Sequence, residues 1–276
     1  MSTINAKEAQ LKVKKIQDTI YPILCEIDSF CTEKGIQYFL CAGSCLGAVR
    51  HKGFIPWDDD ADIMLPRQDY DRFIEEYSRY KERKYQIGAI SIKKDWNREF
   101  CRVWNDKTSL HLNKLEDVNL GVFVDVFPID GFPTSKTAQR MYLAHMKILS
   151  SLGLATIKSE FFEGEKYRFL KKVLKVVLKP LGMRYFAKKM DKLARKYPFS
   201  SSKYVGVGIA PGYGKREIMP KSALEKETRM RFVDRDFSIP LDYNTYLSNL
   251  YGNYMEIPKN AAENGYTHLQ DWDIEL

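Results

Sequence analysis

The sequence predicts an α+β fold, in which helices flank a mixed β-sheet and a helical segment is appended to it. Two observations support this expectation. Short apolar, strand-like runs alternate with helical periodicity in the first half of the chain, and long helical runs dominate residues 137–197. With 276 residues, 44% of them hydrophobic and 29% charged, the chain also has the size and composition to bury a sizeable core.

The first helix is expected at residues 8–34, where apolar side chains recur near a period of 3.6 residues and Gly35 follows. Gly43 and Ser44 stand between the first strand and the second helix. The next elements are expected in this order: strand 36–41, helix 45–50, strand 58–65 and helix 67–80.

Strand candidates continue at 85–92, 100–105 and 109–112. The strongest strand signal is the run 121–127, which is dense in β-branched and aromatic residues and is expected to end at Pro128. Asp130 is expected to be a turn residue before Gly131. The remaining elements are expected as follows: helix 137–154, helix 166–197 with a break at 180–182, punctuated loops, a short helix around 243–251 and an irregular tail.

This order divides the chain into three parts. We expect residues 1–134 to form the catalytic core and residues 135–200 to form a basic helical segment. Residues 201–276 are then expected to supply loops and short helices that complete the active-site cleft.

The positive charge is concentrated in one place. The formal net charge is +8, and residues 166–196 hold twelve Lys and Arg against a single acid, Asp191. Such a local patch indicates a local anionic partner rather than general affinity for nucleic acid. This helix either packs on the core with a solvated basic face or lies on an anionic membrane; twelve bases with one acid favour the membrane. Its apolar stripe comprises Phe169, Val173, Leu174, Val177 and Leu178.

The sequence favours a cytoplasmic location, at the inner face of the plasma membrane if the basic helix binds lipid. No apolar run approaches the roughly 20 residues of a membrane span, and the N-terminal residues lack the pattern of a secretory signal. The five cysteines lack CxxC spacing and have no histidine near them. We therefore expect buried free thiols in a reducing compartment rather than a zinc site.

The chemistry is expected at an acidic run. Asp58, Asp59, Asp60 and Asp62 place four carboxylates within five positions, bounded by apolar residues on both sides. On an extended chain, Asp58, Asp60 and Asp62 would share one face. Carboxylates this close repel one another unless a cation neutralises them, and oxygen ligands suit Mg²⁺ completed by substrate phosphate. The alternative is a charged turn after Pro56, which the apolar flanks and the upstream Gly-Ser pair disfavour.

A third carboxylate is expected from another strand. Asp125 lies in the middle of the strongest strand, where a buried acid requires a partner. Its alternative role is a buried hydrogen-bond acceptor. Gly43 is expected to admit a phosphate close to the backbone, and Ser44 to offer a hydroxyl and an amide at a helix start. A strand, Gly-Ser, a helix, a strand with Asp-x-Asp and a later acidic strand form the layout of the nucleotidyltransferase fold.

The run 42–63 resembles the signature of the LicD family of bacterial phosphocholine transferases, which are related to the fukutin-type ribitol-phosphate transferases. The runs 38–40, 123–131 and 250–258 are similar to the same family, so the resemblance spans nearly the whole chain. It implies a nucleotidyltransferase-like mixed sheet. Ser44 stands where the family usually has Thr, and the C-terminal motif around His268 is looser than in the family, so His268 receives no role.

The resemblance implies transfer of phosphocholine from CDP-choline to a sugar hydroxyl of a teichoic acid or lipopolysaccharide precursor, with release of CMP. Mg²⁺ or Mn²⁺ would be the cofactor. Asp60 and Asp62 would be the metal ligands, with Asp58 assisting and Asp125 completing the cage. Asp125 would also accept the proton of the attacking hydroxyl.

Phosphate-binding cations are expected nearby. Arg50 and Arg102 are proposed as phosphate clamps, since the guanidinium fork suits phosphate, and Lys52 as a further contact. A structural ion pair is the alternative for both arginines. Choline requires an aromatic box, for which the sequence offers this pool without choosing: Tyr38, Trp57, Trp104, Tyr213 and Trp272.

Two other functions remain open at this point. The first keeps the catalytic fold but transfers another phosphoalcohol, such as ribitol phosphate, or a nucleotide to a small acceptor or protein. The second is a non-catalytic basic module that binds membrane or nucleic acid. The acidic run disfavours this second reading, because a binder of phosphate backbones gains nothing from clustered carboxylates.

Overall fold

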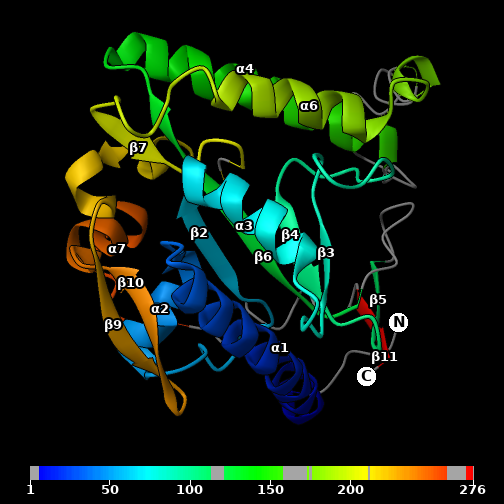
Figure 1. The fold of residues 1–276 in the computed structure, drawn as a ribbon. Coiled ribbons are helices and arrows are strands. Elements are labelled where there is room, and N and C mark those ends of the chain that lie inside the picture. The colour runs from blue at the N-terminus through cyan, green and yellow to red at the C-terminus, as the bar shows by residue number, and fades with distance from the viewer. Residues whose placement is uncertain are drawn as a thin grey trace.

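A mixed β-sheet forms the centre of the molecule (Figure 1). The computed structural model describes residues 6–112, 121–157, 173, 176–210, 212–259 and 272–275. In sheet order the central strands are β1 (Phe39–Leu40), β2 (Asp62–Pro66), β6 (Phe123–Phe132), β4 (Cys101–Trp104) and β3 (Gln86–Gly88). Only β2 and β6 pair in parallel; the other neighbours in this order are antiparallel. The predicted α+β class with a mixed sheet is confirmed.

The central strand β6 is longer than the sequence predicted. It continues through Pro128, and its distal end, Asp130–Phe132, pairs with β7 (Tyr204–Gly206), which pairs in turn with β8 (Met219–Pro220). Along the same edge, β4 pairs with β6 only as far as Val126. Pro128 therefore falls between two pairing segments, where its missing N–H costs the sheet little. The predicted strand end at this proline is wrong.

Three helices follow the predicted order. They are α1 (Ala6–Lys34), α2 (Ala42–His51) and α3 (Arg67–Arg79). In Figure 1, α1 and α3 cross in front of the sheet. Their packing is aromatic, since the Phe30 ring on α1 lies 5.9 Å from that of Phe73 and 5.1 Å from that of Tyr77 on α3. The helix α1 also contacts β6, and α3 contacts both β2 and β6, so the two helices cover one face of the sheet.

Several boundaries differ from the prediction near the acidic run. The helix α2 begins at Ala42, so Gly43 and Ser44 lie in its first turn rather than before it. The strand β2 begins only at Asp62, so the preceding acids are not extended strand residues. The strands β1 and β3 are also shorter than predicted. Strand pairing, which a local pattern does not contain, decides where each of these strands begins and ends.

Two long helices, α4 (Lys136–Ile157) and α6 (Gly182–Ala194), pack side by side along the top of Figure 1. They share a second, smaller core with the end of β6, formed by Phe132, Tyr142, Met146, Met190, Ala194 and Ile209. The helix α6 begins at Gly182, whose φ is +67°, which confirms the predicted break. Part of the predicted apolar stripe, including Phe169 and Leu174, lies outside the described residues.

The C-terminal region is more ordered than the predicted loops. The strands β9 (Glu227–Phe232) and β10 (Arg235–Pro240) form an antiparallel hairpin that packs against α2 and β1. The helix α7 (Tyr243–Tyr251) follows, and β5 (Ser109–Leu112) pairs with β11 (Trp272–Glu275). Two 3₁₀ turns, η1 (Gly214–Glu217) and η2 (Lys221–Leu224), precede the hairpin.

All five cysteines are free thiols. Four of them are buried, namely Cys31, Cys41, Cys45 and Cys101, whereas Cys25 is only half-buried. Burial raises the pKa of each buried thiol above its usual range, so these side chains stay protonated and pack as small apolar groups. The expected buried thiols are therefore confirmed at four of the five positions.

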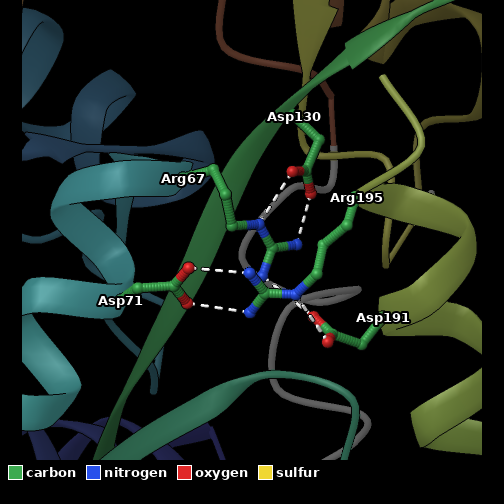
Figure 2. A network of polar contacts seen from close by, with 5 residues as sticks. All are labelled: Arg67, Asp71, Asp130, Asp191 and Arg195. Atoms are coloured by element: carbon green, nitrogen blue, oxygen red, sulfur yellow. Dashed lines mark hydrogen bonds and ion pairs between the residues drawn. The ribbon is translucent and has the colours of Figure 1, made fainter. Parts of the chain in front are cut away.

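An ionic network joins α6 to the sheet (Figure 2). Arg67 donates to both oxygens of Asp130, with an Nε–Oδ1 distance of 2.7 Å, and to Asp191 at 2.9 Å. Arg195 donates to Asp191 at 2.7 Å and to both oxygens of Asp71. Asp130 is fully buried within β6, so its predicted role as a turn residue is wrong. Its carboxylate instead fixes the helical pair against the core.

Candidate active site

A row of charged side chains crosses three neighbouring strands at the centre of the candidate site. In the parallel pairing of β2 with β6, Asp62 is the register partner of Asp125. In the antiparallel pairing of β6 with β4, Asp125 is the partner of Arg102. Register partners project from the same face of a sheet, so the three side chains lie side by side. The predicted proximity of Asp125 to the acidic run is therefore found in the structure.

The remaining acids occupy an irregular segment, 58–61, that leads into β2. Its path is held by α1, where the buried Gln17 amide donates to the carbonyls of Ile55 at 3.1 Å and Asp58 at 2.8 Å. Further along, the Ala61 carbonyl accepts from the Asp125 N–H at 3.1 Å. Gln17 lies in a helix far from the acids in sequence, and no local pattern marked it. It acts by fixing the backbone that carries the carboxylates.

The first turn of α2 supports both ends of this segment. A Cβ atom on Gly43 would come within 2.5 Å of Oδ2 of Asp58, so a larger residue there would displace that carboxylate. The buried Ser44 hydroxyl accepts the Asp62 N–H at 2.9 Å. Gly43 thus lies directly beside Asp58, and its contact with a phosphate stays a prediction. Ser44 positions Asp62 by anchoring its backbone.

Each carboxylate of this cluster makes the ionisation of its neighbours less favourable. Burial raises the pKa of Asp60 well above its usual range, and the charges of Asp62, Asp59 and Asp125 raise it further. Burial likewise raises the pKa of Asp62, with Asp125 and Asp58 adding to the effect and Arg102 opposing it. Such a cluster of negative charge is stabilised by a cation, because neutralisation removes the repulsion.

An all-oxygen donor set of this kind fits Mg²⁺ or Mn²⁺ in its chemistry. Within the described ranges, however, no three His, Cys, Asp or Glu side chains form a group ready to hold a metal ion. Asp125 explains part of this, since Arg102 holds both of its oxygens, at 2.5 and 2.8 Å. Asp60 and Asp62 are the acids left to receive a cation first, with Asp58 beside them.

Two arginines with unused donors lie next to Asp125. Arg102 is buried, its guanidinium carbon lies 3.3 Å from the Phe123 ring centroid, and its Nη1 has no hydrogen-bond partner. Nε of Arg98 is also buried without a partner. Burial and the charge of Arg102 lower the pKa of Arg98 to about 10. Two guanidinium groups held together with free N–H donors form a site that suits an anion such as phosphate.

Arg98 was missed in the sequence, because it stands in an irregular segment without periodicity. Arg50 donates to the carbonyls of Tyr254 at 2.7 Å and Glu256 at 3.3 Å, which anchors the segment after α7. Lys52 caps the C-terminal end of α2, and its Nζ lies 3.6 Å from Sδ of Met230. The substrate contacts expected of Arg50 and Lys52 stay predictions.

The aromatic residues proposed for choline binding differ clearly in their surroundings in the structure. Tyr38 is buried and donates to Asp28 at 2.6 Å, while Trp104 stacks on Trp96 at 5.9 Å, so neither ring is free for a ligand. Trp57 lies edge-on to His51. The side chain of Trp272 and all of His268 lie outside the part of the chain whose side chains are described. Tyr213 is 37% exposed and lines a cavity together with Glu99.

This cavity has a volume of about 720 Å³ and is lined by α4, by Glu99 and by the segment around Tyr213. The Tyr213 hydroxyl shares a hydrogen bond of 2.8 Å with that of Tyr251. Burial raises the pKa of Tyr213 to about 12, and the negative charges of Asp62 and Asp58 contribute. Because Glu99 directly follows Arg98 in the chain, the cavity adjoins the arginines that lie next to Asp125. Neither Glu99 nor Tyr251 was singled out in the sequence.

Comparisons with known proteins agree with this geometry. Residues 35–190 match the family model described as LicD/FKTN/FKRP, nucleotidyltransferase domain. The chain is 27% identical to the lipopolysaccharide cholinephosphotransferase LicD of Haemophilus influenzae, over 98% of both chains. It is also 32% identical to an uncharacterized protein of Rickettsia typhi, but this covers only 32% of this chain and 30% of that protein. A similar protein of Rickettsia prowazekii is 35% identical over 25% of this chain and 26% of its own.

Proposed function

The chain belongs to the LicD/FKTN/FKRP family, and from this premise we propose that it transfers phosphocholine from CDP-choline to a sugar hydroxyl, releasing CMP. The acceptor is a cell-surface glycan precursor, either a lipopolysaccharide or a teichoic acid. The observation that carries this proposal is the row of Asp62, Asp125 and Arg102 in register across three strands, with Asp60 beside it. Support for phosphocholine comes from the Haemophilus influenzae relative, which is named as a cholinephosphotransferase.

The reaction is a displacement at phosphorus. The oxygen of the sugar hydroxyl forms a bond to the phosphorus that bears choline. The bond from that phosphorus to the oxygen bridging the two phosphates breaks, and CMP leaves with the electron pair. The hydroxyl proton is released. Such chemistry depends mainly on positioning and on neutralising charge rather than on covalent help from the protein.

Asp60 and Asp62, with Asp58 beside them, are the residues that would hold Mg²⁺ or Mn²⁺. A bound divalent cation would neutralise phosphate oxygens and stabilise the leaving oxygen of CMP. Nη1 of Arg102 and Nε of Arg98 supply N–H donors to the phosphates. Asp125 was expected to accept the hydroxyl proton, but both of its oxygens are engaged by Arg102, so we assign it the role of orienting that arginine.

The outer face of α4 and α6 supports peripheral membrane contact. In the described parts of the chain, no helix combines the length and apolar character that crossing a bilayer demands. Met141 and Ile148 on α4 are 69% and 57% exposed, and Leu181 before α6 is 46% exposed. The helix α4 contains three Lys and Arg and no acid. We propose that residues 135–200 bring the enzyme to an anionic membrane carrying a lipid-linked acceptor, and that residues 201–276 complete the cleft.

The decisive test is product formation by the purified protein. Incubation with CDP-choline, Mg²⁺ and a panel of lipopolysaccharide and teichoic acid precursors should release CMP and label one class of glycan. Asp62→Asn should lower the rate at least about 100-fold, because Asp62 lies at the centre of the site. Replacing CDP-choline by CDP-ribitol separates the two phosphoalcohol chemistries. Release of CMP from CDP-ribitol alone would overturn the choline assignment.

A further inference from the structure

The cavity of about 720 Å³ next to the acidic site has lining groups of opposite charge. Leu143, Lys147 and Ser151 of α4 line one part of it, and Glu99 and Tyr213 line another. Glu99 directly follows Arg98, and the strand that carries Arg102 begins two residues after Glu99. Glu99 therefore brings the cavity that it lines with Tyr213 next to the proposed phosphate site.

Tyr213 presents a fixed aromatic surface. Its ring centroid lies 5.3 Å from that of Tyr251, with the two ring planes at 82°. The hydrogen bond between the two hydroxyls holds this orientation, and Tyr213 remains 37% exposed. The fixed position lowers the entropic cost of binding a ligand against the ring. An exposed aromatic face binds a quaternary ammonium group, which has no N–H to donate and so depends on cation–π attraction.

Glu99 supplies the matching negative charge. Its half-buried carboxyl lies on the chain between Arg98 and the strand that carries Arg102, so cationic and anionic groups alternate along this segment. Phosphocholine has the same alternation, with an anionic phosphate joined to a cationic trimethylammonium group. The two arginines suit the phosphate, and Glu99 with Tyr213 suits the cation. An uncharged polyol gains nothing from this combination.

Resting on the function proposed above, we infer that Glu99 and Tyr213 form the subsite for the trimethylammonium group of the donor, and thereby select choline over uncharged alcohols. The ammonium group of Lys147 repels a cation, which keeps the choline group on the side of the cavity away from α4. This subsite also explains why Tyr213, unlike Tyr38 or Trp104, keeps its ring uncovered.

The test compares CDP-choline with CMP, which lacks the choline phosphate. Binding of each is measured by titration calorimetry in Mg²⁺. Tyr213→Leu should weaken CDP-choline about tenfold and leave CMP within about twofold, since only the cation–π contact is lost. Tyr213→Phe keeps the ring and should bind CDP-choline within about threefold of the wild type. Glu99→Gln should weaken CDP-choline several-fold without affecting CMP.

Tyr185→Leu is the matched control, because Tyr185 is 41% exposed on α6 and is not among the residues lining the cavity. It should change neither affinity. Equal weakening of CMP and CDP-choline by Tyr213→Leu, or no weakening of either, would overturn the choline subsite. If these variants leave CDP-choline binding unchanged while the wild type still releases CMP, the proposed function stands and only the subsite fails. If the wild type binds neither CDP-choline nor CMP, the proposed function fails as well.

Discussion

At the residue scale, the site places acidic side chains close to one another and, next to them, two arginine side chains close to each other. Asp60 and Asp62 repel each other and have raised pKa values, while Arg98 and Arg102 have buried N–H donors without partners. Each set is stabilised by the opposite charge, the acids by a cation and the arginines by phosphate. A metal–diphosphate complex would supply both, which is why we propose one such ligand for the two halves of the site.

Asp60→Asn should make the metal-free protein more stable while it removes activity. Because the folded-state pKa of Asp60 lies above its unfolded value, its ionisation destabilises the fold as the pH rises toward neutrality. Asparagine cannot ionise. A gain of about 1 kcal/mol would raise the midpoint of thermal unfolding by roughly 2–4 °C in EDTA at pH 7.

The same variant should lose stabilisation by Mg²⁺ with CDP-choline. Asp18→Asn, at a side chain 62% exposed on α1, is the control and should behave like the wild type. A lower midpoint for Asp60→Asn in EDTA would contradict the assignment of repulsion to this carboxylate.

Glu217 provides a separate test of buried charge. Burial raises the pKa of Glu217 from 4.5 to about 8, whereas the hydrogen bond that its carboxylate accepts from the Tyr213 N–H acts to lower the pKa. Its folded pKa exceeds its unfolded one, so its stabilising contribution is complete below pH 4.5 and is lost as the pH rises through about 8. Glu217→Gln should flatten the decline in unfolding free energy measured by urea denaturation between pH 4.5 and 8. Glu225→Gln, at an exposed side chain, should leave the decline intact.

At the element scale, the acidic segment 58–61 is held from two sides. The helix α1 supplies Gln17 to its backbone, and the first turn of α2 supplies Gly43 and Ser44 to Asp58 and Asp62. Pairing with β6 then brings Asp125 alongside. The site thus depends on the relative placement of two helices and two strands, which preorganises the carboxylates before a ligand arrives.

The ionic network around Arg67 joins α3, β6 and α6 in a similar way. Arg67→Met would leave the carboxylate of Asp130 buried without its partner and should cost about 3–5 kcal/mol in the free energy of unfolding. Urea denaturation measures this loss. Combining it with Asp130→Asn should recover part of the stability, because the uncompensated charge is gone.

The control for this network is Arg79→Met, where the arginine is 77% exposed and pairs with Glu75 on the surface. Such pairs contribute about 0–1 kcal/mol, so little change is expected. A loss at Arg67 no larger than that at Arg79 would show that the network does not hold α6 against the sheet.

At the scale of the whole molecule, the helices α4 and α6 form one flank (Figure 1), and α4 lines the cavity together with Glu99 and Tyr213. The cavity that we assign to choline is bounded by α4, so the proposed membrane face and the donor site share one helix. A lipid-linked acceptor held at the flank would approach the cleft without leaving the membrane surface.

The protein should therefore sediment with vesicles of anionic lipid and dissociate as salt is raised, because the attraction is screened. Vesicles of neutral lipid should retain little protein. Replacing Met141 and Ile148 by Ser should weaken binding to anionic vesicles, since both side chains are exposed on α4. The same change at Met255 and Ile257, exposed elsewhere, is the control. Binding that ignores lipid charge would contradict the membrane proposal.

The sequence alone was sufficient for most helices, and it singled out Asp60, Asp62 and Asp125 as candidate site residues. Helical periodicity, a run of carboxylates between apolar residues and a lone acid in an apolar strand are all local properties, so they can be recognised without a structure. The family resemblance, which also rests on short contiguous runs of sequence, is confirmed by the match over residues 35–190.

Only the tertiary structure decided how the side chains are used. Arg102 neutralises Asp125 because β4 and β6 pair in one register, and Asp130 is a buried ion-pair partner because α3 and α6 meet over β6. The roles that we propose for Arg98 and Tyr213 rest on a buried N–H donor without a partner and on the lining of a cavity. Each depends on contacts between segments far apart in the chain, and the free energy of burying or pairing a charge is set by those neighbours rather than by adjacent residues.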